Sequence, residues 1–233
     1  IAATHEGDLY QYAGIEPLTN PLTAIVAVNT TAGTASEVTR HCVLTNTETK
    51  VKFVIVSWRN LPSVSINDPL LMIGKPAALT AATGMDALTH AVEAYISKDA
   101  NPVTDAAAMQ AIRLIQAVAL GSNLQARENM AYASLLAGMA FNNANLGYVH
   151  AMAHQLGGLY DMPHGVANAV LLPHVARYNL IANPEKFADI AELMGENITG
   201  LSTLDAAEKQ AQKQLEEGKA EGEALLEELR HRQ

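Results

Sequence analysis

The stretch TAATGMDALTHAVEAY, residues 80–95, decides how this chain folds. Its apolar residues recur at the spacing of a helix, alanine dominates, and runs of β-branched residues are missing. We therefore predict a helix here. Asp86 and His90 lie four positions apart, so on a helix they share one face and can point a carboxylate oxygen and an imidazole nitrogen at a common point.

The chain continues in a helical pattern on the C-terminal side of this stretch. We predict further helices over residues 104–119, 127–142, 146–158, 165–180 and 184–194, with breaks at Pro163 and Pro184. Residues 130–160 contain no charged side chain and would be long enough to span a bilayer. Their asparagine, glutamine and histidine side chains would need partners in lipid, so we predict buried helices of a helical domain over 76–203, not a membrane segment.

Residues 1–75 have the character of an α/β domain. Residues 24–28 form a short apolar run that predicts a buried strand, and residues 51–58 and 63–67 predict two more. Residues 204–233 differ from the rest, because they hold 8 acidic and 5 basic residues with few apolar anchors. We interpret this charged tail as a solvated helical hairpin, with a partner-binding helix as the alternative.

Composition excludes several classes of protein. The chain has 233 residues, 49% of them hydrophobic and 17% charged, which is enough apolar material for a sizeable core. The single cysteine, Cys42, excludes an internal disulfide and favours a cytoplasmic location. A formal charge of −9 argues against nucleic acid as a main partner. The N-terminus has no signal-peptide pattern and opens as if within a domain, which we interpret as the mark of a truncated or chimeric chain.

Three further histidines lie close together in the sequence. His150 and His154 repeat the four-residue spacing on a second predicted helix, and His164 follows in a turn. One carboxylate with several imidazoles suits Fe(II) or Zn(II) better than Cu(I) or Ca(II). The alternative is that these are hydrogen-bonded core histidines, and we weigh the two interpretations as about equal on spacing alone.

A small-residue turn after the first predicted strand is the second candidate site. Thr30, Thr31, Gly33 and Thr34 would let backbone N–H groups and hydroxyls approach a phosphate. An ordinary turn or helix cap would use the same residues and is favoured when the turn is taken alone. Lys52, within a predicted strand, could reach a phosphate or ribose hydroxyl, although a solvated lysine is the simpler interpretation.

Four motifs together resemble a known family. They are NTTAGTASEVT at 29–39, ATGMDALTHAVE at 82–93, VHAMAHQLGG at 149–158 and PHGVAN at 163–168. In this order they are similar to the iron-containing (group III) alcohol dehydrogenases, and within them to the bacterial branch with lactaldehyde reductase and its ethanol-active relatives. The resemblance covers about residues 1–205. Glycerol dehydrogenases and dehydroquinate synthases share the overall plan but match these motifs less closely.

The resemblance implies a fold, a reaction and a set of site residues. It implies a partial α/β nucleotide-binding domain before a mainly α-helical metal-binding domain, and reversible NAD- or NADP-linked oxidation of a primary alcohol to an aldehyde. The implied ligands of Fe(II) or Zn(II) are Asp86, His90, His150 and His164, and His154 is the implied proton relay. The implied dinucleotide-binding residues are Thr30, Thr31, Gly33, Thr34, Thr39 and Lys52. We also expect a homo-oligomer.

Departures from the family pattern leave a second hypothesis open. The chain begins after the position of the family's glycine-rich phosphate loop, the segment 111–118 is shorter than in the family, and the charged tail stands where further helices are expected. The alternative hypothesis is therefore a non-catalytic metal-binding scaffold or an engineered fragment derived from such an enzyme.

Overall fold

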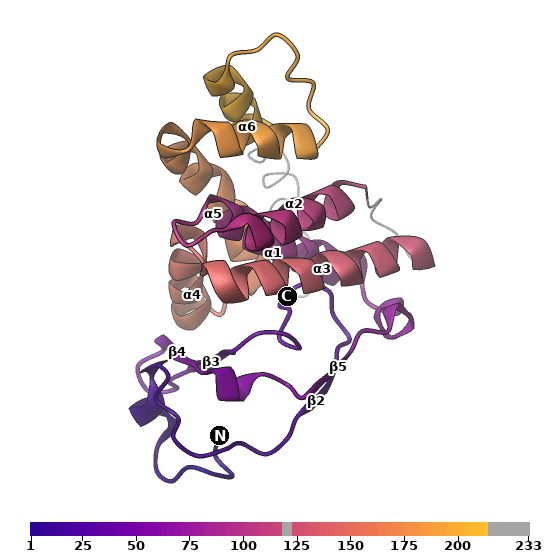
Figure 1. Ribbon diagram of the computed structural model, residues 1–233. Helices are drawn as coiled ribbons and strands as arrows, with labels where there is room; N and C mark the ends of the chain where they lie inside the picture. The colour runs from indigo at the N-terminus through magenta and orange to yellow at the C-terminus, as the bar shows by residue number, and fades with distance from the viewer. Residues whose placement is uncertain (118–122, 214–233) are drawn as a thin grey trace.

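A computed structural model describes residues 1–117 and 123–213 of the chain. The helical part lies on one side of the molecule and the strands on the other (Figure 1). Its helices are α1 (Ala77–Ile96), α2 (Pro102–Gln116), α3 (Leu124–Ala144), α4 (Tyr148–Tyr160), α5 (His164–Asn179) and α6 (Pro184–Leu193). The predicted helices therefore exist, with ends that differ by a few residues.

Local sequence signals start several of these helices. Asn101 caps α2 by accepting from the backbone N–H groups of Val103 and Thr104, and Pro102 occupies the first helical position. Asn123 caps α3 by accepting from the N–H group of Gln125. By contrast, α4 and α5 begin without a side-chain cap on the preceding residue. The first backbone N–H groups of α4 donate instead to a side chain of α1, that of Glu93.

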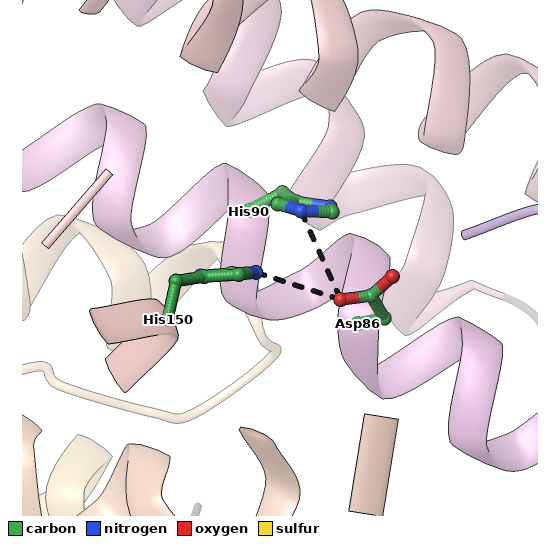
Figure 2. A group of neighbouring side chains, drawn as sticks. All are labelled: Asp86, His90 and His150. Carbon is green, nitrogen blue, oxygen red and sulfur yellow. Dashed lines mark ion pairs between the residues drawn. The ribbon is translucent and has the colours of Figure 1, made fainter. Parts of the chain in front are cut away.

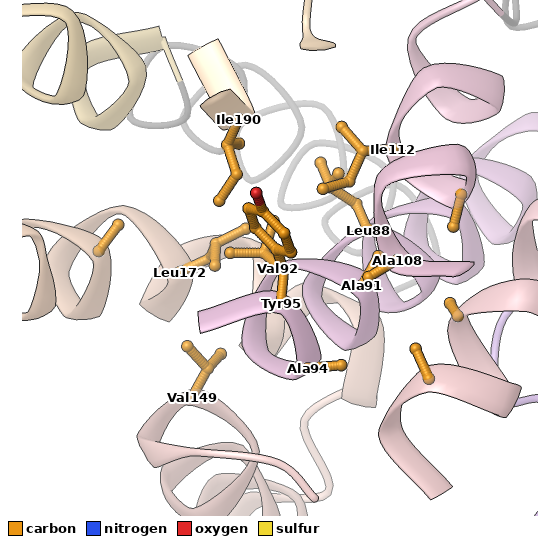
Figure 3. Packing of buried hydrophobic residues seen from close by; sticks show 14 of the residues in the cluster. Leu88, Ala91, Val92, Ala94, Tyr95, Ala108, Ile112, Val149, Leu172 and Ile190 are labelled. Carbon is orange, nitrogen blue, oxygen red and sulfur yellow. The ribbon is translucent and has the colours of Figure 1, made fainter. Parts of the chain in front are cut away.

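Helix α1 is the centre of the core. Every residue from Met85 to Tyr95 is buried, so this part of the helix is covered on all sides. Figure 3 shows its apolar side chains between those of the surrounding helices. The labelled partners are Ala108 and Ile112 from α2, Val149 from α4, Leu172 from α5 and Ile190 from α6. A helix buried on all sides holds its polar residues in a fixed place, which is why Asp86 and His90 can form a rigid site.

The strands form two small sheets in the N-terminal part. In one, β1 (Gly14–Ile15) pairs in parallel with β4 (Lys52–Val56), which pairs antiparallel with β3 (His41–Thr45). In the other, β2 (Val26–Val28) pairs in parallel with β5 (Val64–Ile66). Short 3-10 helices at Leu9–Tyr12, Trp58–Asn60, Pro69–Met72 and Leu180–Ala182 complete the described elements. A strand-containing N-terminal part followed by a mostly helical part confirms the predicted fold class.

The prediction of a buried strand at 24–28 was wrong in one respect. A strand forms at Val26–Val28, but both of these valines are exposed, Val26 by 59%. The apolar run indicated burial, yet β2 pairs only with β5, and no described element covers the valine side of this strand pair. Strands β1 and β3 were not predicted, because β1 has two residues and His41–Thr45 lacks a continuous β-branched run.

The uncharged region 130–160 lies in α3, α4 and their connection, so the predicted helices are present. Burial holds for most of its α3 part, but in α4 only Val149, His150, Ala153 and Gly158 are buried, because one side of that helix is left uncovered by the described residues. Among the described residues, none of the helices combines the length and the apolar character that crossing a membrane requires.

The charged tail begins differently from the prediction. Residues 203–213 are helical, and Ala206, Ala207 and Ala211 are buried, two of them in the main core cluster. Small alanine side chains let this segment pack against the core, so its described part is not a solvated helix. Lys209 and Lys213 reach Glu196 at 3.0 and 3.1 Å and help to hold it there. The remainder of the tail, 214–233, lies outside the described residues.

Candidate metal centre

One carboxylate and three imidazoles from three helices converge on a single point. Asp86 and His90 lie on α1, His150 lies in the first turn of α4, and His164 is the first residue of α5. From Asp86 Oδ1, the Nε2 atom lies 3.8 Å away in His90, 3.5 Å in His150 and 3.5 Å in His164. Figure 2 shows His90 and His150 turned toward Asp86 from two helices. The ligand atoms of these three residues all lie within 4.8 Å of one another.

Close helix packing brings the fourth residue into place. Gly165 follows His164 at the start of α5, and a Cβ atom built on Gly165 would overlap the carbonyl oxygen of Ala82 in α1. Only a residue without a side chain therefore lets α5 begin this close to α1. His164 is more open than the other three, with 29% of its side chain exposed against 6% or less for theirs.

Hydrogen bonds at Nδ1 turn two of the rings toward the centre. His90 Nδ1 lies 3.2 Å from the carbonyl oxygen of Gly33, and His150 Nδ1 lies 2.7 Å from Glu93 Oε2. Because an oxygen acceptor holds a proton on Nδ1, the Nε2 atom of each ring is the one that faces Asp86. His164 Nδ1 is buried and has no hydrogen-bond partner among the described residues. The Phe141 ring stacks on His90 with 4.3 Å between centroids and fixes the plane of that ring.

The side chain of Asn168 lies at the same point. Its Nδ2 atom donates to Asp86 Oδ1 at 2.8 Å and lies 3.2 Å from His150 Nε2 and 3.4 Å from His164 Nε2. Asn168 is one turn along α5 from His164 and is fully buried. The Asn168 amide nitrogen, with its positively polarised hydrogens, therefore lies against the donor atoms that would surround a cation.

Burial and mutual interaction shift the pKa values of the cluster. Burial would raise the pKa of Asp86, but His90, His150 and His164 around it lower it well below its usual range. Burial lowers the pKa of His90 to about 3, and the neighbouring histidines add to that effect. Burial would also lower the pKa of His150, but its bonds with Asp86 and Glu93 prevail and raise it to about 9. The cluster therefore holds a stable carboxylate, and of His90, His150 and His164 only His150 carries a positive charge at neutral pH.

These residues fit a divalent transition-metal ion. One carboxylate oxygen and three imidazole nitrogens are a borderline donor set, which suits Fe(II) and Zn(II). All the donors are buried or half-buried, and the Nδ1 bonds of His90 and His150 are the outer interactions that metal-binding histidines need. The donors open onto a cavity of about 360 Å³, so a ligand could approach from one side.

The cavity also contains some of the residues predicted to bind a dinucleotide. Thr34, Thr39 and Lys52 line it together with the four candidate ligands. Lys52 lies in β4, and its side chain passes over α4. A Cβ atom built on Gly157 of that helix would lie 3.3 Å from Lys52 Nζ. The structure therefore brings part of the threonine loop, the lysine and the histidine cluster to one hollow.

The other predicted dinucleotide residues lie elsewhere. Thr30 is exposed and Thr31 half-buried, and neither lines the cavity. Gly33 is buried against α1, where a Cβ atom would lie 2.8 Å from Thr83 Cβ, and its carbonyl oxygen faces His90. Besides its predicted role in binding a dinucleotide, this loop therefore orients the candidate ligand His90. That these residues bind a dinucleotide stays a prediction.

His154 lines the cavity beside the cluster. Its ring centroid lies 5.3 Å from that of His164 and 6.4 Å from that of His150. Burial lowers its pKa to about 4, and repulsion from His164, His150 and Lys52 contributes. The proton-relay role that the resemblance implies for His154 stays a prediction. In the folded chain His154 is a neutral imidazole at pH 7, and so it can receive a proton only transiently.

Sequence reasoning missed two buried residues at this centre, Glu93 and Asn168. A signal for each was present, since Glu93 follows His90 by three positions and Asn168 follows His164 by four, spacings that share a helix face. Both were quoted within motifs, but neither was given a role.

The chain matches one known protein family over most of its length. Residues 80–228 match the Fe-containing alcohol dehydrogenase family, C-terminal, and residues 1–69 match Iron-containing alcohol dehydrogenase. The chain belongs to the iron-containing alcohol dehydrogenase family. The predicted resemblance is thereby confirmed, and the match to residue 228 includes most of the charged tail.

Individual members of the iron-containing alcohol dehydrogenases are similar over most of this chain. The 1,3-propanediol dehydrogenase of Klebsiella pneumoniae is 96% identical over 214 residues, covering 90% of this chain and 55% of the relative. The NAD-dependent methanol dehydrogenase of Bacillus methanolicus is 51% identical over 90% of this chain and 56% of the relative. A crystal structure of 1,3-propanediol oxidoreductase superimposes with a TM-score of 0.90 at 90% identity, covering 95% of this chain and 59% of that one. The chain spans about half the length of the curated relatives that it matches.

Proposed function

We propose that this chain carries the metal-binding part and the adjoining threonine loop of a NAD- or NADP-linked alcohol dehydrogenase. Its reaction would be the reversible transfer of hydride between a short primary alcohol and the nicotinamide, with the aldehyde as the other product. Support comes from the convergence of Asp86, His90, His150 and His164 beside a cavity that also contains Thr39 and Lys52. The names of the relatives point to short alcohols and diols as the substrate class.

The four candidate ligands would hold Fe(II) or Zn(II). When bound, the ion supplies a positive charge that stabilises negative charge developing on the substrate oxygen. The Asp86 carboxylate stays ionised because three histidines surround it, so the centre is ready to accept a cation. His90 and His150 keep fixed orientations through Gly33 and Glu93, which reduces the reorganisation that binding requires.

The remaining cavity residues would bind and orient the organic reactants. The Lys52 ammonium group on the cavity wall can hold an anionic or hydroxyl group of the dinucleotide. Thr39 offers a hydroxyl on the same wall. The neutral His154 ring can accept and pass on the alcohol proton without a lasting charge, because its pKa is about 4. Phe141 and Leu146 line the cavity and exclude water from part of it.

The test measures metal content, dinucleotide binding and turnover on the same preparation. The chain is loaded with Fe(II) without oxygen or with Zn(II), and metal content, calorimetric NAD and NADP binding, and NADH formation with ethanol and 1,3-propanediol are recorded. We expect one ion per chain, lost in Asp86→Ala. Metal binding with no dinucleotide affinity would favour the non-catalytic scaffold, and unchanged metal content in Asp86→Ala would contradict the site itself.

A further inference from the structure

Glu93 is a buried carboxylate that faces no lysine or arginine among the described residues. It is 3% exposed and lies on α1, one turn beyond His90, so it shares a helix face with two candidate ligands. A charge in this position must be compensated by hydrogen bonds. Glu93 Oε1 accepts from the N–H group of Val149 at 2.7 Å, and Oε2 accepts from His150 Nδ1 at 2.7 Å and from the His150 N–H group at 3.4 Å.

These contacts place the carboxylate at the start of helix α4. Gly147 precedes that helix and offers no side-chain cap, so the Glu93 oxygens take the acceptor role for its first turn. Gly147 also makes the necessary room, because a Cβ atom there would lie 2.9 Å from Glu93 Oε1. Glu93 thus fixes both where α4 begins and how His150, in its first turn, is rotated.

We infer that Glu93 is the positioning residue of the metal centre, which holds the proton of His150 on Nδ1 and so keeps the Nε2 lone pair available to the ion. This inference rests on the proposed function. Both Glu93 oxygens are acceptors of N–H groups, so the residue cannot be replaced by a group that also donates. The carboxylate also polarises the imidazole and makes Nε2 a stronger donor to a cation.

The replacement Glu93→Gln separates this role from simple space filling. The glutamine amide has the same shape but only one acceptor oxygen, so it cannot satisfy both Val149 and His150 Nδ1. If its NH2 group faces His150, the ring proton moves to Nε2 and the lone pair toward the ion is lost. Glu93→Asp keeps two acceptor oxygens on a shorter side chain and serves as the conservative variant.

The matched control is Asp105→Asn. Asp105 lies on α2 and binds Lys186 Nζ at 3.0 and 3.1 Å, away from the centre. It undergoes the same change from carboxylate to amide and also loses a hydrogen-bonded partner. Any general loss of stability from such a change will appear in both variants, whereas an effect on the ion will appear only in Glu93→Gln.

The experiment measures zinc affinity by competition with a chelator, and the His150 tautomer by nitrogen-15 NMR of the zinc-loaded chain. We expect affinity to fall about 10- to 100-fold in Glu93→Gln, less in Glu93→Asp, and by under about twofold in Asp105→Asn. Wild type should show the His150 proton on Nδ1. If Glu93→Gln does not fold, the wild-type Nδ1–H signal decides alone, because zinc on Nε2 leaves the proton on Nδ1 whatever accepts it. A proton signal shifted far downfield by the Glu93 carboxylate supports the inference, and a signal without that shift overturns it.

The outcomes also separate this inference from the proposed function. Wild-type chain that binds no zinc would contradict the metal centre, and the role of Glu93 with it. Wild-type chain that binds zinc, together with a folded Glu93→Gln variant of equal affinity, would overturn the positioning role alone.

Discussion

The Cα atom of Gly165 lies so close to Ala82 that any side chain at position 165 would collide with the Ala82 carbonyl oxygen. This contact joins the first turn of α5 to α1, and His164 stands directly before it. The distance from His164 Nε2 to Asp86 Oδ1, 3.5 Å, therefore depends on a residue that has no chemistry of its own.

Gly165→Ala should move the start of α5 away from α1 and carry His164 out of the centre. We expect a loss of about 1–3 kcal/mol in the free energy of unfolding from overpacking, and a clear decrease in zinc affinity. Gly84→Ala is the control, because a Cβ atom there meets only Met130 Cε at 3.5 Å. That change should leave metal binding intact and stabilise α1 by about 0.5–1 kcal/mol. Equal behaviour of the two variants in thermal unfolding would contradict the packing argument.

Zinc binding at pH 7 should release one proton. His150 has a pKa raised to about 9, so it is protonated in the metal-free chain, whereas the lowered pKa values of His90 and His164 leave those rings neutral. The ion must displace the His150 proton, so the affinity should rise about tenfold per pH unit below pH 9 and level off above it. Calorimetry in buffers of different ionisation enthalpy measures the released proton. Release of no proton, or of two or more protons, would show that this charge assignment is wrong.

Asn168→Ala should destabilise the metal-free chain more than the zinc-loaded chain. The amide nitrogen bonds Asp86 Oδ1 at 2.8 Å, and its loss leaves a buried carboxylate oxygen without that donor. We expect a cost of about 1–3 kcal/mol without metal. A bound ion would interact with the same oxygen, so zinc should restore most of the difference. Thermal unfolding with chelator and with zinc makes the comparison, and Asn143→Ala, which removes an exposed bond to Met139, should cost little in either state.

Lys75→Met should stabilise the chain near pH 7. Burial and repulsion from Arg127 lower the pKa of Lys75 to about 8, and Arg127 is itself buried and donates to Thr80. The folded chain holds this proton less tightly than the unfolded chain, so wild-type stability should rise as pH increases from about 8 toward 10.5. Melting temperatures at pH 7 and 9.5 test this, with a smaller gain for Lys75→Met at the higher pH. Lys98→Met, at an exposed position, should change little.

The amino-acid sequence was sufficient to predict the helices and to nominate the ligands. Helical spacing and proline breaks are local properties, so they are readable without knowledge of the fold. The four-residue interval between Asp86 and His90 already predicts that they share a face. The order of the four motifs indicated the family, and comparison with known proteins confirmed it.

The sequence misled where burial depends on what covers an element. The apolar run at 24–28 predicts a buried strand, but the valines of β2 are exposed because this strand pairs only with β5. The charged composition of residues 204–233 predicts a solvated helical hairpin, but three alanines of its described part, 204–213, are buried. In both cases the residue pattern within the strand or helix is the same whether or not another element covers it.

Tertiary structure alone decided how the centre is held. Nothing in the spacing of His150 shows that its Nδ1 meets Glu93, 57 positions earlier, or that the Gly33 carbonyl oxygen meets His90 Nδ1 across the same separation in sequence. Such bonds between distant segments follow from the packing of helices on one another. The same packing shifts the pKa of His154 to about 4 and that of His150 to about 9, although both residues begin with the same side-chain chemistry. Residue identity fixes which atoms can act, and the surrounding fold fixes their charge and direction.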